Sequence, residues 1–380
     1  MALSKIDVAN MLTGLVPNDN TIRRPNAQPL IMNGDMQVAQ RSTSVSGVGD
    51  GDTGYHTLDR WRFSEGGDNS TVFTMSQNTD VPTGQGFANS LKMDVTTADG
   101  SPGSSDAMFL QQRFEGQDLQ LLKKGTSSAE KITVSFWVKS TKTGTYILEV
   151  QDSDNTRNCS QSYTVSSADT WEKKVVVFPA DTTGALDDNN ENSFEVNWWL
   201  LAGTDFTSGT LATSFASRTN ANRAVGQVNV GDSTSNNFYM TGCQMEIGEF
   251  SSTTLPPFQH ETFEENLFRC FRYYYYLAPA TGLRFIGWCQ MDNDDTNHVA
   301  YIDFKTHMRV APSALEQSGT ASHYKIREAS TQTCDAVPTF NNADTWYSQV
   351  SFKKSSSGFS QGEVNKVGID GGYLAWSAEL

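Results

Sequence analysis

The chain has 380 residues and a formal net charge of −15, with 37% hydrophobic and 11% aromatic residues. Its acidity argues against nucleic-acid binding and against docking on an anionic membrane, because those surfaces carry the same sign of charge. The aromatic content argues against disorder. Together with many Gly, Ser, Thr, Asn and Asp residues, it predicts an all-β protein of two or three domains.

The five cysteines are widely spaced and odd in number: Cys159, Cys243, Cys270, Cys289 and Cys334. This pattern disfavours a zinc site or a disulfide framework and predicts buried thiols. No apolar run approaches the roughly 20 residues of a membrane helix, and the N-terminus lacks a signal-peptide core. We therefore expect assembly in the cytoplasm and release by cell lysis.

Residues 1–29 are predicted to form an anchoring arm. Apolar side chains at helical spacing predict one short amphipathic helix, formed by Ile6, Val8, Met11, Leu12 and Leu15. Three prolines between residues 17 and 29 then prevent regular structure. Such a segment cannot bury a core alone, so we expect it to be held by a partner chain.

Residues 30–250 alternate short apolar strands with polar turns. In Ile132–Val138 every second residue is apolar, which places those side chains on one face of a strand. Further strands are predicted at 146–150, 171–178, 194–200 and 237–247. This succession of short strands without helical periodicity predicts a jelly-roll β-sandwich.

Short motifs in this region resemble known proteins. Four pieces resemble landmarks of the jelly-roll carbohydrate-binding modules attached to glycanases: Asn33–Asp35, Leu58–Trp61, Val134–Val138 and Asp169–Glu172. Bacteriophage appendage proteins share these landmarks, and Asn33–Arg41 resembles their pattern "N-G-x-M-x-x-x-Q-R". The resemblance implies a carbohydrate-binding-like jelly roll at residues 30–250.

The stretch Thr241–Leu277 resembles a pattern of bacteriophage tail-fibre and appendage proteins. The matching residues are Gln244, Glu246, Gly248, Thr254, Pro257, Phe258, Glu265, Leu267, Cys270, Arg272, Tyr273 and Tyr274. The resemblance implies a homotrimeric virion protein. Its residues 1–29 would bind other tail or virion proteins.

Residues 251–277 are assigned to a connector and a tyrosine-rich collar. Four consecutive tyrosine hydroxyls each need a partner, so we expect that they cannot all enter the core of one monomer. Tyr and Arg are enriched at interfaces. The predicted inter-subunit residues are Arg269, Arg272, Tyr273, Tyr274, Tyr275 and Tyr276.

Residues 278–380 predict a smaller β-sandwich. Strands are expected at 285–288, 298–304, 345–352 and 372–380. Met308–Pro312 and the C-terminal Ser377–Leu380 resemble phage fibre-tip domains. A strand at the chain end must be paired or buried, and the resemblance implies that threefold assembly covers it.

Nothing in the sequence predicts catalysis. The motifs of serine hydrolases, zinc proteases, dinucleotide-binding proteins and phosphate-binding loops are missing, and the five histidines are scattered. We therefore expect no enzymatic activity. A polysaccharide depolymerase needs only two carboxylates brought together by the fold, so that class stays an alternative.

Trp198 and Trp199 are adjacent on a predicted strand and therefore point to opposite faces of the sheet. Trp199 shares its face with Asn197 and Glu195, and an aromatic ring beside polar groups suits a sugar. These three residues are the predicted glycan contacts, with structural packing of both tryptophans as the alternative. Three other tryptophans are predicted to lie in the core: Trp61, Trp137 and Trp171.

The module resemblance also implies a structural calcium near Asn33 and Asp35. The modules use an Asp of the last strand as well, where this chain has Thr241 or Gly242. A second oxygen-rich segment, 292–297, lacks the sixth-position Gly of an EF-hand loop. A solvated turn is the alternative there.

These observations predict a tail fibre or related appendage of a tailed phage that attaches to host-surface glycans. Weak sugar contacts would be multiplied by several copies on one particle. Three alternatives stay open. They are a structural protein without a receptor (head fibre, decoration or tail adaptor), an isolated carbohydrate-binding module, and a depolymerase.

Overall fold

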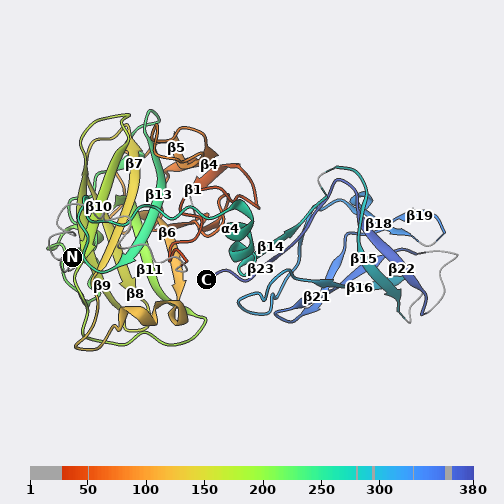
Figure 1. Ribbon diagram of the computed structural model, residues 1–380. Coiled ribbons are helices and arrows are strands. Elements are labelled where there is room, and N and C mark those ends of the chain that lie inside the picture. The colour runs from red at the N-terminus through yellow and green to blue at the C-terminus, as the bar shows by residue number, and fades with distance from the viewer. Residues whose placement is uncertain (1–27, 50, 280, 293–295, 328, 356–361) are drawn as a thin grey trace, which may run out of the picture. The chain divides into compact units, whose positions relative to one another are not determined.

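The computed structural model describes residues 28–380, apart from 50, 280, 293–295, 328 and 356–361. The predicted anchoring arm, with Ile6, Val8, Met11, Leu12 and Leu15, lies outside the described residues. As predicted, the protein is all-β, built from antiparallel sheets in sandwich arrangement with a few short helices (Figure 1). No described helix is long and apolar enough to cross a bilayer.

The chain divides into two units. Unit 2 comprises the described residues within 38–43, 57–60 and 262–380, and unit 1 comprises the other described residues. The tyrosine-rich segment therefore belongs to the C-terminal unit and is no separate collar. Two short loops from the N-terminal part of the chain also belong to unit 2, which the sequence does not indicate.

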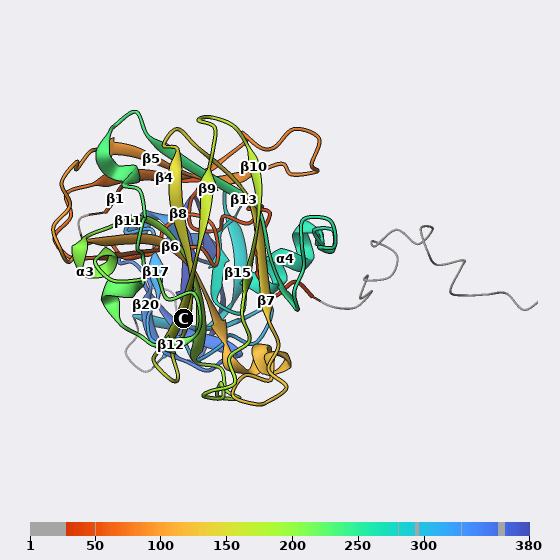
Figure 2. The ribbon, with the colours of Figure 1, turned by 90° about the vertical axis from the view of Figure 1, so that its left-hand side faces the viewer.

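Unit 1 contains two antiparallel sheets, in the orders β1-β4-β5-β13-β7-β10 (the first sheet) and β12-β9-β8-β11-β6-β3-β2 (the second sheet). The first sheet is built from β1 (Ser44–Gly49), β4 (Val72–Asn78), β5 (Ser90–Thr97), β7 (Ile132–Ser140), β10 (Glu172–Phe178) and β13 (Asn237–Ile247). The second is built from β2 (Gly54–Tyr55), β3 (Arg62–Gly66), β6 (Ala107–Glu115), β8 (Gly144–Asp152), β9 (Arg157–Val165), β11 (Asn192–Ala202) and β12 (Ala216–Ser217). Strands β8 and β9 lie side by side in both ribbon views (Figures 1 and 2).

The core of unit 1 lies between the two sheets. The alternating apolar residues of β7 are all buried, which confirms the predicted inward face of that strand. Aromatic rings fill the centre, with the Trp61 and Trp198 centroids 5.3 Å apart and Phe136 5.9 Å from Trp198. Trp61 is fully buried, so its predicted core position is confirmed.

The core positions predicted for Trp137 and Trp171 are wrong. Trp137 is half-buried because it alternates with the inward Phe136 and Val138 and so faces outward. Trp171 immediately precedes β10, is half-buried, and donates from Nε1 to Oδ1 of Asp80 over 3.0 Å.

Unit 2 contains a large sheet, β19-β18-β22-β15-β16-β21-β20, and a small sheet, β14-β23-β17. Their strands are β14 (Tyr274–Leu277), β15 (Arg284–Met291), β16 (Asn297–Asp303), β17 (Glu316–Gln317), β18 (Tyr324–Arg327), β19 (Thr331–Thr333), β20 (Thr339–Ala343), β21 (Tyr347–Lys353), β22 (Val364–Ile369) and β23 (Leu374–Ser377). One apolar cluster joins both sheets, with Ile302 and Val350 of the large sheet and Trp376 of the small one.

The C-terminal strand β23 is paired on both sides within the chain. Tyr275 of β14 lies opposite Trp376, and Glu316 of β17 lies opposite Ala375. This strand therefore needs no second subunit to satisfy its edges, which removes one reason for expecting a trimer.

Candidate functional site

The predicted glycan contacts are buried. Glu195, Asn197 and Trp199 share one face of β11, as the alternation predicts, but none is more than 7% exposed. The Trp199 ring lies between Phe109 and Phe206, with centroid distances of 5.0 and 5.5 Å. A ring enclosed in this way cannot stack on a sugar, so the structure corrects the surface position expected for Trp199.

A crossing segment between β11 and β13 covers this face. It contains the short helices α3 (Thr204–Thr207) and η2 (Asn220–Asn222). Its apolar side chains Leu211 and Ala224 pack in the cluster around Trp199. The sequence does not indicate this cover, because the segment is rich in Ser, Thr, Asn and Gly and its apolar residues are too sparse to indicate burial.

Under the cover, polar side chains cross the second sheet in register. The row runs through Arg62, Gln111, Asn197, Glu149 and Ser160, one from each of five neighbouring strands. Gln111 Nε2 donates to Glu195 and Asn197 over 2.7 and 2.9 Å, and Asn197 Nδ2 donates to Glu149 over 3.2 Å. The middle of the row is thus internally satisfied.

Glu149 is the centre of this network. It is fully buried and accepts two hydrogen bonds from Arg223 of the cover, over 2.8 and 2.9 Å. Asn158 and Trp199 also donate to its carboxylate, over 3.1 and 3.2 Å. These contacts fasten the cover to the sheet, which is a structural role.

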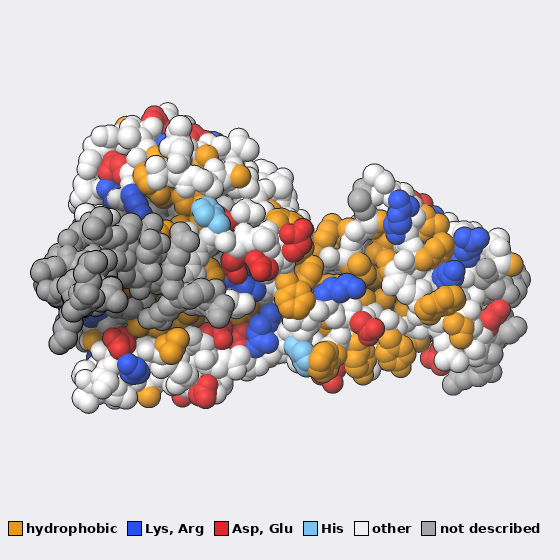
Figure 3. Space-filling model, viewed as in Figure 1, with side chains coloured by type: hydrophobic (Ala, Val, Ile, Leu, Met, Phe, Trp, Pro, Cys, Tyr) orange, Lys and Arg blue, Asp and Glu red, His pale blue; other side chains and the backbone are white. Residues whose placement is uncertain are grey.

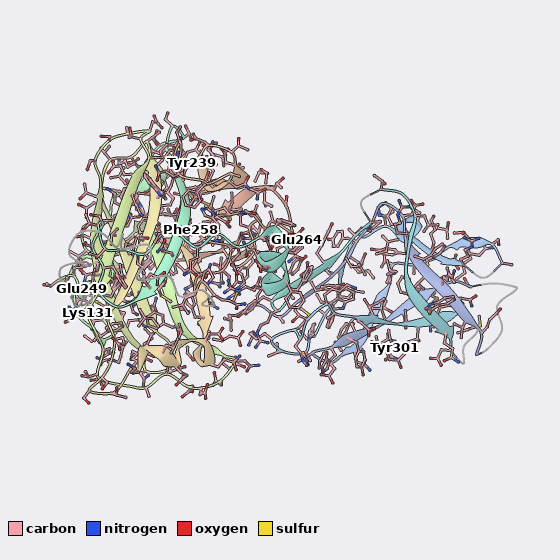
Figure 4. The ribbon with its side chains drawn as sticks, viewed as in Figure 1. Lys131, Tyr239, Glu249, Phe258, Glu264 and Tyr301 are labelled. Atoms are coloured by element: carbon pink, nitrogen blue, oxygen red, sulfur yellow. The ribbon has the colours of Figure 1, made fainter. Side chains whose placement is uncertain are left out.

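The outer face of the large sheet in unit 2 presents aromatic rings to solvent. Trp288 of β15 is 61% exposed and Tyr301 of β16 is 60% exposed. Both lie two residues from the cross-strand pair Gln290–Val299, so they project from the same face of the sheet. Figure 3 shows hydrophobic side chains gathered on the visible surface of unit 2. Figure 4, drawn in the same view, labels Tyr301 in this region.

Polar groups accompany these rings. Gln349 lies opposite Tyr301 and donates from Nε2 to the Tyr301 hydroxyl over 3.1 Å. Lys366 lies opposite Trp288, with its Nζ 5.0 Å from the ring centre. A cavity of about 370 Å³ lies beside Tyr301 and Gln349, lined by Gln290, Met291, Asp292, Val299, Tyr301, Gln349 and Gly362. Its volume is that of a small-ligand site.

We call this surface the aromatic face and define it by Trp288, Gln290, Tyr301 and Gln349. The sequence alone does not indicate it. The sequence predicts strands at residues 285–288 and 298–304. It does not predict the register between β15 and β16, and this register brings Trp288 and Tyr301 to the same face of the sheet. The available signal was aromatic residues alternating with buried ones in two neighbouring strands.

The tyrosine run is accommodated within one chain, contrary to the expectation that one monomer could not bury it. Tyr273, Tyr274 and Tyr275 are at most 3% exposed, and only Tyr276 is half-buried. The Tyr274 hydroxyl donates to Glu316 Oε2 over 2.9 Å.

Two arginines from the N-terminal part of the chain cover two of these rings. The guanidinium of Arg60 lies 3.5 Å from the centre of the Tyr273 ring, and that of Arg41 lies 3.6 Å from the centre of the Tyr274 ring. Intramolecular partners therefore replace the inter-subunit partners that we expected. Contacts of Arg269 and Arg272 with another subunit stay a prediction.

The predicted calcium residues lie in a tight turn. Oδ2 of Asp35 accepts a hydrogen bond from Gln37 over 2.5 Å and lies 4.0 Å from His260. Burial raises the pKa of Asp35. The backbone carbonyl of Asn33 accepts hydrogen bonds from the Met36 amide and from the Trp61 indole. Calcium at Asn33 and Asp35 stays a prediction.

Among the described residues, no group of three or more His, Cys, Asp or Glu side chains is placed to hold a metal ion. One cage of oxygens does surround a cation, and that cation is the ammonium of Lys124. It contacts Asp152 and Asp181, and it donates to the carbonyls of Thr183 and Gly184 over 3.0 and 2.8 Å.

The second candidate calcium segment, 292–297, includes residues 293–295 outside the described part. The cysteine prediction is confirmed: all five are free and buried. Burial raises the pKa of Cys159, Cys289 and Cys334 to about 12, so these thiols are unreactive at neutral pH.

No protein-family model matches the chain, and neither does any curated protein. Solved structures give weak matches. The enzymatically active domain of tailspike protein 4 from bacteriophage CBA120 shares 15% identity at a TM-score of 0.30, over 58% of this chain and 21% of that one. The chain thus spans about a fifth of the tailspike structure.

A family 11 carbohydrate-binding module from Clostridium thermocellum, solved with a mixed-linked tetrasaccharide, shares 10% identity. Its TM-score is 0.27, over 55% of this chain and 96% of that one. Because these TM-scores are low, the fold assignment rests on the strand order and register of the chain itself.

Proposed function

We propose that this chain is an appendage protein of a tailed-phage virion that attaches to host-surface glycans through the aromatic face of unit 2. The virion role is supported by the tail-fibre-like motifs between Asn33 and Leu277. Residues 1–29 would anchor the chain to other virion proteins, in a homotrimer assembled in the host cytoplasm and released by lysis. The protein binds without turnover.

The aromatic face is the observation that carries the glycan assignment. Sugar rings have an apolar face that stacks on aromatic rings and hydroxyls that pair with amides. Trp288 and Tyr301 supply exposed rings, and Gln290 and Gln349 supply amides beside a cavity of suitable size. Exposed large aromatics gathered on one face of a folded protein usually mark a binding surface.

A glycan array with the full chain tests this function. We expect binding to at least one bacterial surface polysaccharide, and a clearly weaker signal for that polysaccharide in Trp288→Ala. Trp171→Ala is the matched control, because it removes a half-buried tryptophan from unit 1. Binding to no glycan and to no host cell would contradict the proposal and favour a structural protein without a receptor.

The same purified protein can also be tested for hydrolysis of the polysaccharide that it binds. Release of reducing sugar from a bound polysaccharide would identify a depolymerase and contradict the proposal of binding without turnover. Within the described residues, Glu149 is fully buried and its carboxylate is held by Arg223, so it is unsuited to act on a polysaccharide.

A further inference from the structure

Two arginines meet at the open end of the polar row in unit 1. Arg62 of β3 and Arg113 of β6 both donate to Oε1 of Gln111, over 3.1 and 2.8 Å. Glu195 lies 3.3 Å from Nε of Arg113. In the described part of the chain, Arg62 has no carboxylate within ion-pair distance.

Hydrogen bonds on one side of the Arg62 guanidinium hold it in place and leave its other edge open. Both of its hydrogen bonds leave from Nη1, one to Ser64 over 2.9 Å and one to Gln111. Its Nε and Nη2 have no acceptor among the described residues. These two N–H groups form the edge of a guanidinium that binds a carboxylate through two parallel hydrogen bonds.

The surroundings of Arg62 favour an anion. The side chain is half-buried, and burial followed by the nearby Arg113 lowers its pKa. The more distant Glu195 and Tyr55 oppose this lowering only in part. A partly desolvated charge that lacks a direct ion pair costs free energy, which an incoming anion would recover. The chain as a whole carries −15, so an anion would bind here through local contacts rather than general attraction.

Tyr55 adds a surface for a sugar ring. It lies directly opposite Arg62 in the register of β2 and β3, on the same face of the sheet, and is half-buried. Directly opposed residues have Cβ atoms about 5 Å apart. A carboxylate on the Arg62 edge would therefore bring its attached ring next to the tyrosine.

We propose that Arg62 binds the carboxylate of an acidic sugar, a hexuronate unit, with Tyr55 packing against the ring. The site goes beyond the proposed function, because it lies in a different unit and on a different sheet from the aromatic face. It takes from that function only that the ligand is a glycan. A sulfated sugar would offer related oxygen chemistry, so the test separates the two.

The test follows the Arg62 Nε–H signal in nitrogen–proton correlation spectra of the full chain, assigned by its loss in Arg62→Gln. Glucuronate, glucose, glucose 6-sulfate and acetate are titrated separately. We expect a saturable shift with glucuronate, no shift with glucose, and at least tenfold weaker responses to the sulfate ester and to acetate. An unmoved Arg62 signal, or equal responses to acetate and glucuronate, would overturn the proposal; a stronger response to the sulfate ester would overturn the carboxylate assignment.

Variants make the result specific. Arg62→Lys keeps the charge but cannot form the two parallel hydrogen bonds of a guanidinium. We expect this variant to bind glucuronate at least tenfold more weakly, as measured by calorimetry. Arg284→Gln is the control, because among the described residues the side chain of this exposed arginine donates only to the neighbouring Leu283 carbonyl. Undiminished glucuronate binding by Arg62→Lys would contradict binding through two parallel hydrogen bonds. Trp288→Ala should leave the Arg62 response intact, so this inference and the proposed function can fail separately.

Discussion

Asp59 is a buried carboxyl whose protonation is coupled to the stability of unit 2. Burial raises its pKa to about 6, against the lowering effects of Arg41 and of hydrogen bonds from Gln40. The ordinary pKa of this group, taken for the unfolded chain, is 3.8. Between pH 3.8 and about 6, Asp59 is therefore protonated in the folded chain but ionised in the unfolded chain. Its stabilising contribution is therefore full below about pH 4 and is lost as the pH rises through 6.

Asp59→Asn should remove this dependence. Between pH 4 and pH 7, we expect the free energy of unfolding of the wild type to fall relative to the variant by about 2–3 kcal/mol. Urea unfolding of both proteins at several pH values measures the difference. A constant difference across this range would show that the Asp59 pKa is not raised.

Glu149 and Glu249 form a matched pair of acids in very different surroundings. Glu149→Gln leaves Arg223 buried without its counter-ion, and we expect a loss of about 3–5 kcal/mol. Glu249 pairs with Lys131 over 2.5 Å on the surface, where both side chains are well exposed (Figure 4). Glu249→Gln should cost less than about 1 kcal/mol. Equal effects in urea unfolding would contradict the structural role of the polar row.

Individual elements show where the sequence suffices. The strand β13 has the bounds that the sequence predicts, 237–247, where turn-forming residues stand on both sides of a largely apolar stretch. The helix α4 (Phe263–Cys270) begins with a capping box between Thr262 and Glu265. That Thr-x-x-Glu signature is visible in the sequence.

The candidate sites were less predictable than the strands. Trp199 was placed on the correct face of β11, but the cover from residues 203–227 is a tertiary contact that the local pattern of a polar loop does not encode. The tyrosine run was misjudged for a similar reason. Its partners Arg41 and Arg60 are more than 200 positions away in the chain, and sequence spacing says nothing about such contacts.

Gly34 in the Asn33–Asp35 turn has a packing role that explains the motif. A Cβ at this position would lie 2.1 Å from the carbonyl oxygen of Cys243 on β13, whose amide donates to the Gly34 carbonyl over 2.9 Å. We expect Gly34→Ala to destabilise unit 1 by about 2 kcal/mol or more, because backbone must move. Gly47→Ala is an unsuitable control, since φ is positive there; Gly100→Ala, with open space around it, should have little effect on urea unfolding.

At the scale of the whole molecule, the oligomeric state is the main prediction that the single chain does not test. We expect light scattering to give three times the mass of one chain. Arg272→Glu should lower that mass if the predicted interface is correct. An unchanged mass for this variant would remove Arg272 from the interface, and a monomeric wild type would contradict the homotrimer.

The central claim is that the aromatic face of unit 2 binds glycan. Calorimetry with the glycan selected by the array tests it most directly, comparing the full chain with Trp288→Ala, Tyr301→Ala and the control Trp171→Ala. Loss of one stacking ring should weaken binding on the order of tenfold, whereas the control should bind like the wild type. Equal affinities for all four proteins would contradict the claim.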